Sequence, residues 1–282
     1  MTRHPPGPPS TPKRRFPATL ESMSKSAMGP SGGAKPAILR PQRPVRDAAD
    51  DQGRKTVPIG VGLASGAIRR SMLERMAKGG LRHPALLKAF EAVPRHLFVD
   101  TALVTQAYED TSLPIGHGQT ISKPSVVGRM LALLMARREA QEPGPIPLGR
   151  VMEIGTGCGY QAALLSLLGR SVISIERIKP LHDKARMHLD QLGVPNVRLV
   201  WGDGRLGHAP NAPYDSIIAA AGGEDIPSTW LDQLDVGGCL VAPMYSAAQG
   251  GQVLVCIERL PSGFRRTLHD AVHFVPLKSG YE

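Results

Sequence analysis

Residues 151–160, V-M-E-I-G-T-G-C-G-Y, decide the fold of this 282-residue chain. The segment opens with apolar residues typical of a buried strand, turns through three glycines and runs into Q-A-A-L-L, which favours a helix. A strand, a glycine-rich turn and a helix in this order begin a nucleotide-binding βαβ unit. Glycine suits the turn because the backbone uses φ angles that a Cβ penalises and must approach the ligand closely. The spacing is G-x-G-x-G rather than G-x-G-x-x-G, so the loop alone is a weak signal.

Two further strands are predicted downstream, the first of them buried, and an acidic residue stands at or just after the end of each. Residues 171–176 (S-V-I-S-I-E) end in Glu176, and residues 197–201 lead into Gly202, Asp203 and Gly204. A carboxylate at the end of the second strand of such a unit can accept hydrogen bonds from both hydroxyls of a ribose. A turn or a strand-end acid is ordinary by itself. Three such features, in order at the carboxyl ends of consecutive strands, predict a site for an adenosyl ligand.

The rest of this half of the chain continues the alternation of strands and helices. Further segments are predicted as a helix (180–192), a strand (214–221), a helix (226–236), a strand (239–243) and an antiparallel pair of strands (252–259 and 264–268). Together these segments predict an α/β, Rossmann-like fold. Its central sheet is mostly parallel, with helices on both faces and antiparallel strands near the C-terminus.

Composition divides the chain at about residue 65. Residues 1–65 hold 11 of the 26 prolines, one aromatic residue, and 11 Lys and Arg against 4 Asp and Glu, so most of the net charge of +10 belongs there. We predict a disordered basic tail over 1–65, because it cannot bury enough apolar surface to offset the entropy of ordering. A folded domain is expected over 66–282, with a helical, substrate-loop part (66–149) and the Rossmann-like core (150–282). Its net charge is +3, so it need not bind polyanions.

Cysteine and histidine usage argues against metal and disulfide frameworks. The three cysteines are widely spaced and form no C-x-x-C pair, while His182 and His188 lie six residues apart. We therefore expect reduced thiols, a cytoplasmic protein and no metal. No apolar run approaches the ~20 residues that span a bilayer, so no membrane segment is predicted.

Residues 113–124, L-P-I-G-H-G-Q-T-I-S-K-P, are rich in turn formers and lie between predicted helices. Two helices, ending at Gly79 and before Pro94, precede this stretch, and a helix over 125–135 follows it. The stretch is therefore predicted as a loop that places Ser122 just ahead of a helix N-terminus, where free N–H groups favour anions. A serine there can equally cap the helix, as Ser125 also could, and spacing alone leaves both alternatives open.

From about residue 66 to residue 280, the sequence resembles the protein-L-isoaspartate O-methyltransferase family. The most specific segments are V-P-R-H-L-F-V (93–99), residues 113–124 with their G-Q-T-I-S core, and E-I-G-T-G-C-G-Y-Q (153–161), completed by S-I-E-R (174–177) and G-D-G (202–204). The glycine loop and the two acids are common to many enzymes that use S-adenosyl-L-methionine (AdoMet), whereas G-Q-T-I-S singles out this family. The departures are Cys158 where serine is commoner, Lys123 after the motif serine, and G-G-E (222–224) in place of A-P-E.

The resemblance implies an AdoMet-dependent methyltransferase fold and methyl transfer to the α-carboxylate of L-isoaspartyl residues in damaged proteins. The ester then favours closure to a succinimide, whose hydrolysis returns some normal aspartate. Chemically, such an acceptor needs no general base, because an α-carboxyl group with a reference pKa of about 3.3–3.7 is already ionised at neutral pH. The enzyme must align the carboxylate with the methyl group and exclude water.

We expect Ser122 to orient the reacting carboxylate by donating a hydrogen bond. The residues expected to bind AdoMet are Thr120, Ile121, Glu153, Gly155, Thr156, Gly157, Gly159, Glu176, Asp203, Gly204 and Gln252. Within this set, Glu153 is expected to hold the loop or contact the amino group, Glu176 to accept the ribose hydroxyls, and Asp203 with Gly204 to recognise the adenine amine. Gln252 faces either the sheet ladder or, as the resemblance implies, the cofactor.

Other classes of protein share parts of this pattern. An AdoMet-dependent enzyme acting on RNA or a small molecule is the main alternative. Such an enzyme would need a basic or aromatic platform beside the site, and the folded part has a small net charge in a chain with few aromatic residues. A nicotinamide-dependent dehydrogenase is disfavoured by the loop spacing. The third alternative is a non-catalytic module whose basic tail binds nucleic acid. For the favoured function we expect isoaspartyl proteins and peptides as partners, no nucleic acid or membrane, and a monomer.

Overall fold

The computed structural model describes residues 66–139 and 147–282, so the predictions for residues 1–65 lie outside the described residues. A seven-stranded sheet with the order β5-β4-β3-β6-β7-β8-β9 forms the centre of the described part. Its strands are β3 (Arg150–Ile154), β4 (Ser171–Glu176), β5 (Val197–Trp201), β6 (Tyr214–Ala219), β7 (Leu234–Ser246), β8 (Gly251–Leu260) and β9 (Gly263–Val272). Neighbouring strands from β5 to β7 pair in parallel, and β7, β8 and β9 pair antiparallel. The predicted mostly parallel sheet with antiparallel strands near the C-terminus is confirmed.

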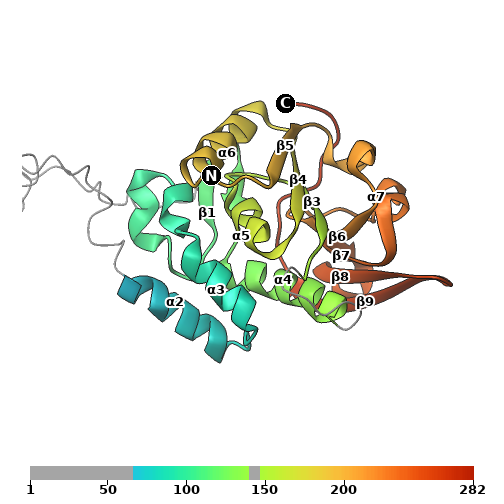
Figure 1. Ribbon diagram of the computed structural model, residues 1–282, viewed down its shortest axis with the longest axis horizontal. Helices are drawn as coiled ribbons and strands as arrows, with labels where there is room; N and C mark the ends of the chain where they lie inside the picture. The colour runs from blue at the N-terminus through green and yellow to red at the C-terminus, as the bar shows by residue number, and fades with distance from the viewer. Residues whose placement is uncertain (1–65, 140–146) are drawn as a thin grey trace, which may run out of the picture. The chain divides into compact units, whose positions relative to one another are not determined.

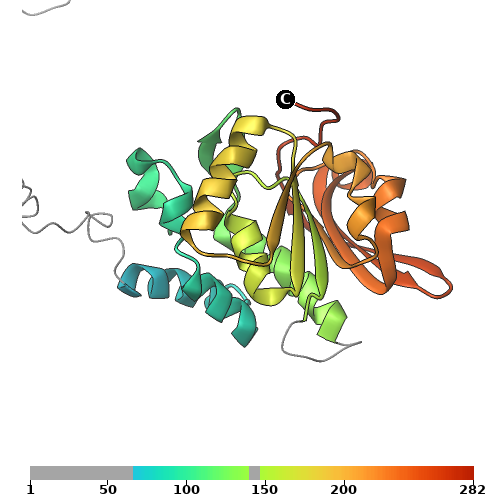
Figure 2. The same ribbon diagram turned by 45° about the horizontal axis from the view of Figure 1, so that its top comes forward.

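Helices cover both faces of this sheet, which explains why β3, β4 and β6 are almost continuously buried. One face carries α4 (Pro124–Glu139), α5 (Tyr160–Leu168) and α6 (Lys179–Gln191), and the other carries the short α7 (Ser228–Gln233) (Figures 1 and 2). Helices α2 (Gly66–Lys78) and α3 (Pro84–Ala92) pack outside α4 and α5. Two apolar clusters result, one on each face, with Leu164 in the first and Trp230 in the second. No helix in the described ranges has the length and apolar character to span a membrane.

The strand order creates a crevice next to β3. The chain moves from β3 outward to β4 and β5, then returns to place β6 on the opposite side of β3. Connections on the two sides of β3 therefore diverge at its carboxyl end, and ligands of open α/β sheets bind at such a point. The glycine loop follows β3 at this position.

Two predicted segments differ in the structure. Residues 113–121 are not an irregular loop but a hairpin of β1 (Leu113–Gly116) and β2 (Gln119–Ile121). Its strands alternate buried and exposed residues, and the turn is made by His117 with φ 54° between two glycines of positive φ, so the turn formers belong to a tight connection. The helix predicted over 226–236 ends earlier, at Gln233, and β7 starts at Leu234. The strand runs on through Gly237, and its register against β6 is irregular there.

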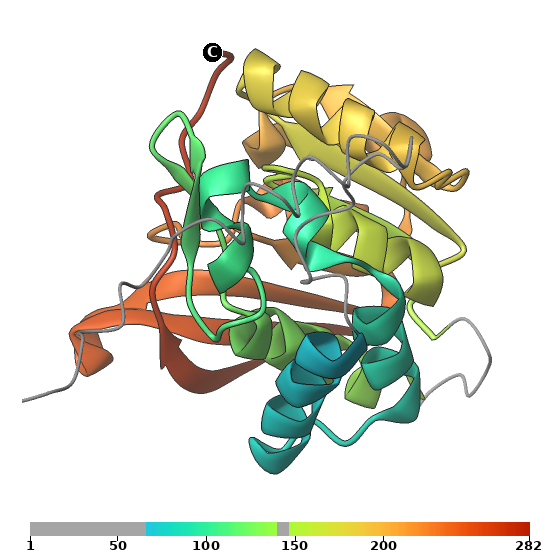
Figure 3. The same ribbon diagram turned by 90° about the vertical axis from the view of Figure 1, so that its left-hand side faces the viewer.

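Beyond β9, residues 274–282 form what we call the C-terminal strap, which crosses the carboxyl ends of the parallel strands. Val275 and Leu277 exchange backbone hydrogen bonds of 2.8 and 2.7 Å with Gly222, just after β6. Further along, Glu282 donates to the carbonyl of Arg177 after β4 (2.9 Å) and accepts from the N–H of Lys179 (2.7 Å). Figure 3 shows the strap, in dark red, running beside the green β1–β2 hairpin. The strap and the hairpin thus flank the crevice.

Candidate active site

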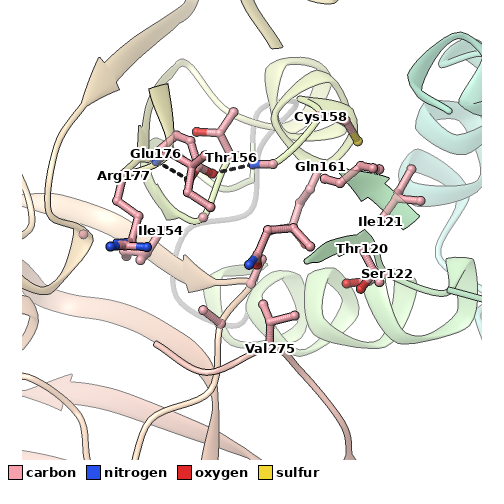
Figure 4. A pocket seen from close by; sticks show the side chains of 18 of the residues that line it. Thr120, Ile121, Ser122, Ile154, Thr156, Cys158, Gln161, Glu176, Arg177 and Val275 are labelled. Atoms are coloured by element: carbon pink, nitrogen blue, oxygen red, sulfur yellow. Dashed lines mark hydrogen bonds between the residues drawn. The ribbon is translucent and has the colours of Figure 1, made fainter. Parts of the chain in front are cut away.

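A cavity opens at the carboxyl ends of β3, β4 and β6, between the β1–β2 hairpin and the C-terminal strap (Figure 4). Eight of the predicted site residues line it: Thr120, Ile121, Ser122, Gly155, Thr156, Gly157, Glu176 and Gly204. Figure 4 shows the hairpin residues on one side, Glu176 and Arg177 on the other, and Val275 of the strap facing them. The structure therefore brings the G-Q-T-I-S segment and the glycine loop to one place, although more than 30 positions separate Ser122 from Gly155.

The three loop glycines are required by backbone conformation. Gly155, Gly157 and Gly159 have φ angles of 86°, 56° and 92°, which L side chains rarely adopt. Gly155 and Gly157 line the cavity, whereas Gly159 is the N-cap of α5 and lies outside the lining. A Cβ on Gly159 would come within 3.3 Å of the Cβ of Ala185 on α6. This glycine therefore also serves helix packing.

Glu176 holds the glycine loop against the end of β4. Its carboxylate is buried and accepts hydrogen bonds from the backbone N–H groups of Gly157 (2.8 Å) and Ile178 (2.9 Å), drawn as dashed lines in Figure 4. A carboxylate offers about four lone-pair positions, so two remain for a ligand. Because Glu176 also lines the cavity, the structure is compatible with its expected bonds to ribose hydroxyls.

Glu153 lies beneath the loop, outside the cavity lining, and is fully buried. It accepts a hydrogen bond from the hydroxyl of Ser174, which in turn lies 2.6 Å from the hydroxyl of Thr156 in the loop. This chain of contacts is the arrangement expected if Glu153 holds the loop. Burial raises the pKa of Glu153 from 4.5 to about 8, so the folded protein keeps this carboxyl group protonated at neutral pH.

The raised pKa of Glu153 predicts a pH-dependent stability. In the unfolded chain the carboxyl group of Glu153 ionises near pH 4.5, whereas in the folded chain it stays protonated up to about pH 8. The free energy of unfolding therefore decreases as pH rises from about 4.5 to 8. Glu153→Gln removes this titration, and we expect its melting temperature relative to the wild type to rise by several degrees between pH 5 and pH 8. Thermal denaturation at pH 5, 6.5 and 8 checks this, with Glu91→Gln on the surface of α3 as the control. A difference that stays constant with pH would contradict it.

The structure distinguishes Ser122 from a helix cap. At the start of α4, Asp110 accepts hydrogen bonds from the backbone N–H (2.9 Å) and the hydroxyl (2.7 Å) of Ser125. The hydroxyl of Ser122 makes no hydrogen bond within the described ranges, and the residue is half-buried on the cavity wall. The carboxylate of Asp110 therefore fills the capping role, and the Ser122 hydroxyl is free to meet a ligand.

Two of the predicted cofactor residues, Asp203 and Gln252, contact other parts of the fold. Asp203 accepts hydrogen bonds from the N–H groups of Gly280 in the strap (2.6 Å) and of Arg205 (2.9 Å). Gln252 is bonded through both ends of its amide to the backbone of Phe274, at 2.7 and 3.3 Å. Neither side chain lines the cavity, so their assignment to the cofactor stays a prediction. Gly204 does line it, and a Cβ there would lie 2.5 Å from the Cγ2 of Ile154.

Sequence patterns missed the strap, which supplies part of the cavity wall through residues 275–278. The only local signal was the departure at Gly222. A Cβ at this position would lie 2.4 Å from the Nε2 of Gln252, the residue whose amide anchors the strap at Phe274. Glycine at 222 therefore leaves room for the anchoring amide.

The V-P-R-H-L-F-V segment packs against a residue of the cavity wall. Arg95 is fully buried, donates to the carbonyl of Ala107 (2.8 Å) and places its guanidinium 4.9 Å from the ring centre of Tyr160, which lines the cavity. His96 is bonded to the hydroxyl of Tyr108 (2.7 Å) and does not line the cavity. Its position is that of a structural residue rather than a catalytic base.

Comparisons with known proteins agree with this geometry. The family model described as protein-L-isoaspartate(D-aspartate) O-methyltransferase (PCMT) matches residues 68–282. A protein-L-isoaspartate O-methyltransferase of Methylibium petroleiphilum is 59% identical over 270 residues, which cover 95% of this chain and 97% of that protein. Another, of Leptothrix cholodnii, is 56% identical over 247 residues, covering 87% of this chain and 86% of that protein.

Solved structures show the same fold. A protein-L-isoaspartate O-methyltransferase superposes with a TM-score of 0.65 at 26% identity, covering 75% of this chain and 66% of that one. A putative protein-L-isoaspartate O-methyltransferase of Plasmodium falciparum, in complex with S-adenosyl-L-homocysteine, gives a TM-score of 0.63 at 22% identity, covering 74% and 98%. On the extent of the family match and the identity to its members, this chain belongs to the protein-L-isoaspartate(D-aspartate) O-methyltransferase family.

Proposed function

We propose that the protein transfers a methyl group from AdoMet to the α-carboxylate of L-isoaspartyl residues in damaged proteins and peptides. This transfer starts their repair to aspartyl residues through a succinimide. The observation that carries the proposal is the position of Ser122. The hairpin sets its hydroxyl, which has no hydrogen bond to another described residue, on the wall of a cavity whose other walls include the glycine loop and Glu176.

The cavity suits an adenosyl cofactor. The spare acceptor positions of Glu176 match ribose hydroxyls, the glycine loop exposes its backbone, and Ile154 and Ile178 offer apolar surface for a base. We infer that the backbone of Gly155 and Gly157 and the carboxylate of Glu176 hold the cofactor here. When bound, AdoMet supplies a methyl group activated by its positive sulfonium.

The chain's own residues then position the acceptor. The hydroxyl of Ser122 donates a hydrogen bond to one oxygen of the ionised carboxylate and directs the other oxygen toward the cavity. Ile115, Ile121 and Val127 line the wall next to Ser122 and keep water from the reacting atoms. Orientation of this kind contributes up to roughly 7–11 kcal/mol to a barrier, which makes positioning sufficient without a proton acceptor.

Two peptides that differ only in an isoaspartyl or an aspartyl linkage test this function. We expect labelled methyl from AdoMet to appear, as a base-labile ester, on the isoaspartyl peptide alone. Transfer to neither peptide, with AdoMet still bound, would refute the repair function. An RNA or small-molecule acceptor is not favoured, because the model of the protein-repair family matches residues 68–282.

We further propose that the enzyme acts as a monomer in the cytoplasm and binds no nucleic acid. The small net charge of residues 66–282 and the free state of Cys158, Cys239 and Cys256 support this. Sedimentation of the full chain, and an RNA-binding titration at low salt, would refute it if they showed a dimer or salt-dependent binding.

A further inference from the structure

A second hollow adjoins the cofactor cavity, and we call it the outer hollow. Residues Ser112, Ser122, Lys123 and Val126 line one side of it, and residues 271–274 line the other. Ser122 is the residue that both hollows share. On the proposed function, the methyl group comes from the cavity and the reacting carboxylate lies at Ser122. The peptide that carries this carboxylate therefore extends through the outer hollow.

The ionisable side chains that line the outer hollow are Lys123 and His273, so no carboxylate faces the peptide there. Lys123 is exposed and makes no ion pair or hydrogen bond through its side chain in the described part of the chain. Two carboxylates of neighbouring segments have partners outside this hollow: Asp110 accepts two hydrogen bonds from Ser125, and Asp270 forms a 2.9 Å ion pair with Arg129. The lining of the outer hollow thus carries the positive charge of Lys123 and holds no carboxylate.

The position of Lys123 is fixed by its neighbours. Pro124 begins α4 and restricts the backbone of Lys123 to extended conformations, immediately after Ser122. Lys123 is also one of the few departures from the family pattern in this segment, so a property of its ammonium group would belong to this chain rather than to the motif.

We propose that Lys123 makes the enzyme favour L-isoaspartyl sites that have an acidic side chain next to the isoaspartyl residue. A flanking carboxylate in the outer hollow would lie near the ammonium group, at the surface, where such pairs have modest energies. The corresponding preference in KM is about two- to fivefold. The effect belongs to recognition of the peptide and not to methyl transfer itself.

The test compares two isoaspartyl peptides, one with Glu and one with Gln on both sides of the isoaspartyl residue. At low salt we expect the wild type to have a KM about two- to fivefold lower for the Glu peptide. This ratio should fall to about one in Lys123→Gln, reverse in Lys123→Glu, and persist in Lys88→Gln, an exposed lysine of α3. It should also shrink at about 0.5 M salt, where surface charges are screened.

Equal KM values for the two peptides in the wild type would overturn the proposal, as would a preference that persists in Lys123→Gln. Either result leaves methylation of isoaspartyl peptides intact, so it counts against Lys123 alone. Absence of transfer to the Gln peptide would instead refute the proposed function, and this inference with it. Because each variant is judged by the ratio between two substrates, a general loss of activity or stability does not imitate the expected result.

Discussion

Replacing Ser122 by alanine is expected to lower kcat on an L-isoaspartyl peptide by about 10- to 100-fold while changing the Kd for AdoMet less than about threefold. The hydroxyl makes no hydrogen bond within the described residues, so its removal leaves no buried partner unsatisfied and should not alter the fold. What is lost is a donor to a charged carboxylate, an interaction of about 1.5–3 kcal/mol. Steady-state kinetics with calorimetric AdoMet binding would measure both quantities.

Ser125→Ala is the matched control for this prediction. It removes a hydroxyl three residues away that is bonded to Asp110 at the start of α4. We expect it to lower the free energy of unfolding by about 1 kcal/mol and to leave kcat close to the wild-type value. If Ser122→Ala kept wild-type turnover, or if both alanine variants lost turnover equally, Ser122 would not be the residue that orients the carboxylate.

Replacing Glu176 by alanine is expected to weaken AdoMet binding by about 100-fold or more. The change removes the acceptor of two backbone N–H groups, those of Gly157 and Ile178, and the acceptor proposed for the ribose. Losing a charged hydrogen bond costs about 1.5–3 kcal/mol, and the loop that forms the cavity wall loses its anchor at the same time. Calorimetry or fluorescence titration with AdoMet would measure the affinity, and circular dichroism the fold.

Two further variants separate a loss of cofactor binding from a general loss of folding. Glu176→Gln keeps one acceptor oxygen, so its affinity should lie between those of the wild type and the alanine variant. Asp183→Asn removes an exposed carboxylate of α6 that pairs with Lys179 outside the cavity, and it should bind AdoMet normally. An unchanged Kd in Glu176→Ala would show that the cofactor does not use this carboxylate.

The sheet and the glycine loop were predictable because their information is local. Buried strands show as apolar runs, and in the loop after β3 glycine marks the points where the backbone takes a positive φ, as at Gly155. The β1–β2 hairpin was predicted as a loop because its three turn residues outweighed a short alternation of buried and exposed positions. The capping of α4 depends on Asp110, fifteen residues upstream of Ser125, which no spacing rule identifies.

The C-terminal strap could not be predicted from sequence patterns. Most of its bonds use backbone groups, such as the N–H of Gly280, which carry no residue-type signature. The bond from Gly280 to Asp203 joins positions that are 77 apart in the chain. The role first expected for Asp203 came from its place after a strand, and the role for Gln252 came from the family resemblance. In the folded chain both side chains meet the strap, so tertiary contacts and not the local pattern determine what they touch.

The strap also sets the order in which the enzyme can become functional during synthesis. Arg177 pairs with Glu282, 105 positions later, and the cavity has walls from residues as early as Ile115 and as late as Lys278. A nascent or partly unfolded chain lacks one wall or the other, so we expect AdoMet to bind only the completed fold. At a cofactor concentration of about 100 times Kd, such selective binding stabilises a protein by about 2.7 kcal/mol. Cells depleted of AdoMet should therefore degrade this enzyme faster, since proteases act on the opened chain.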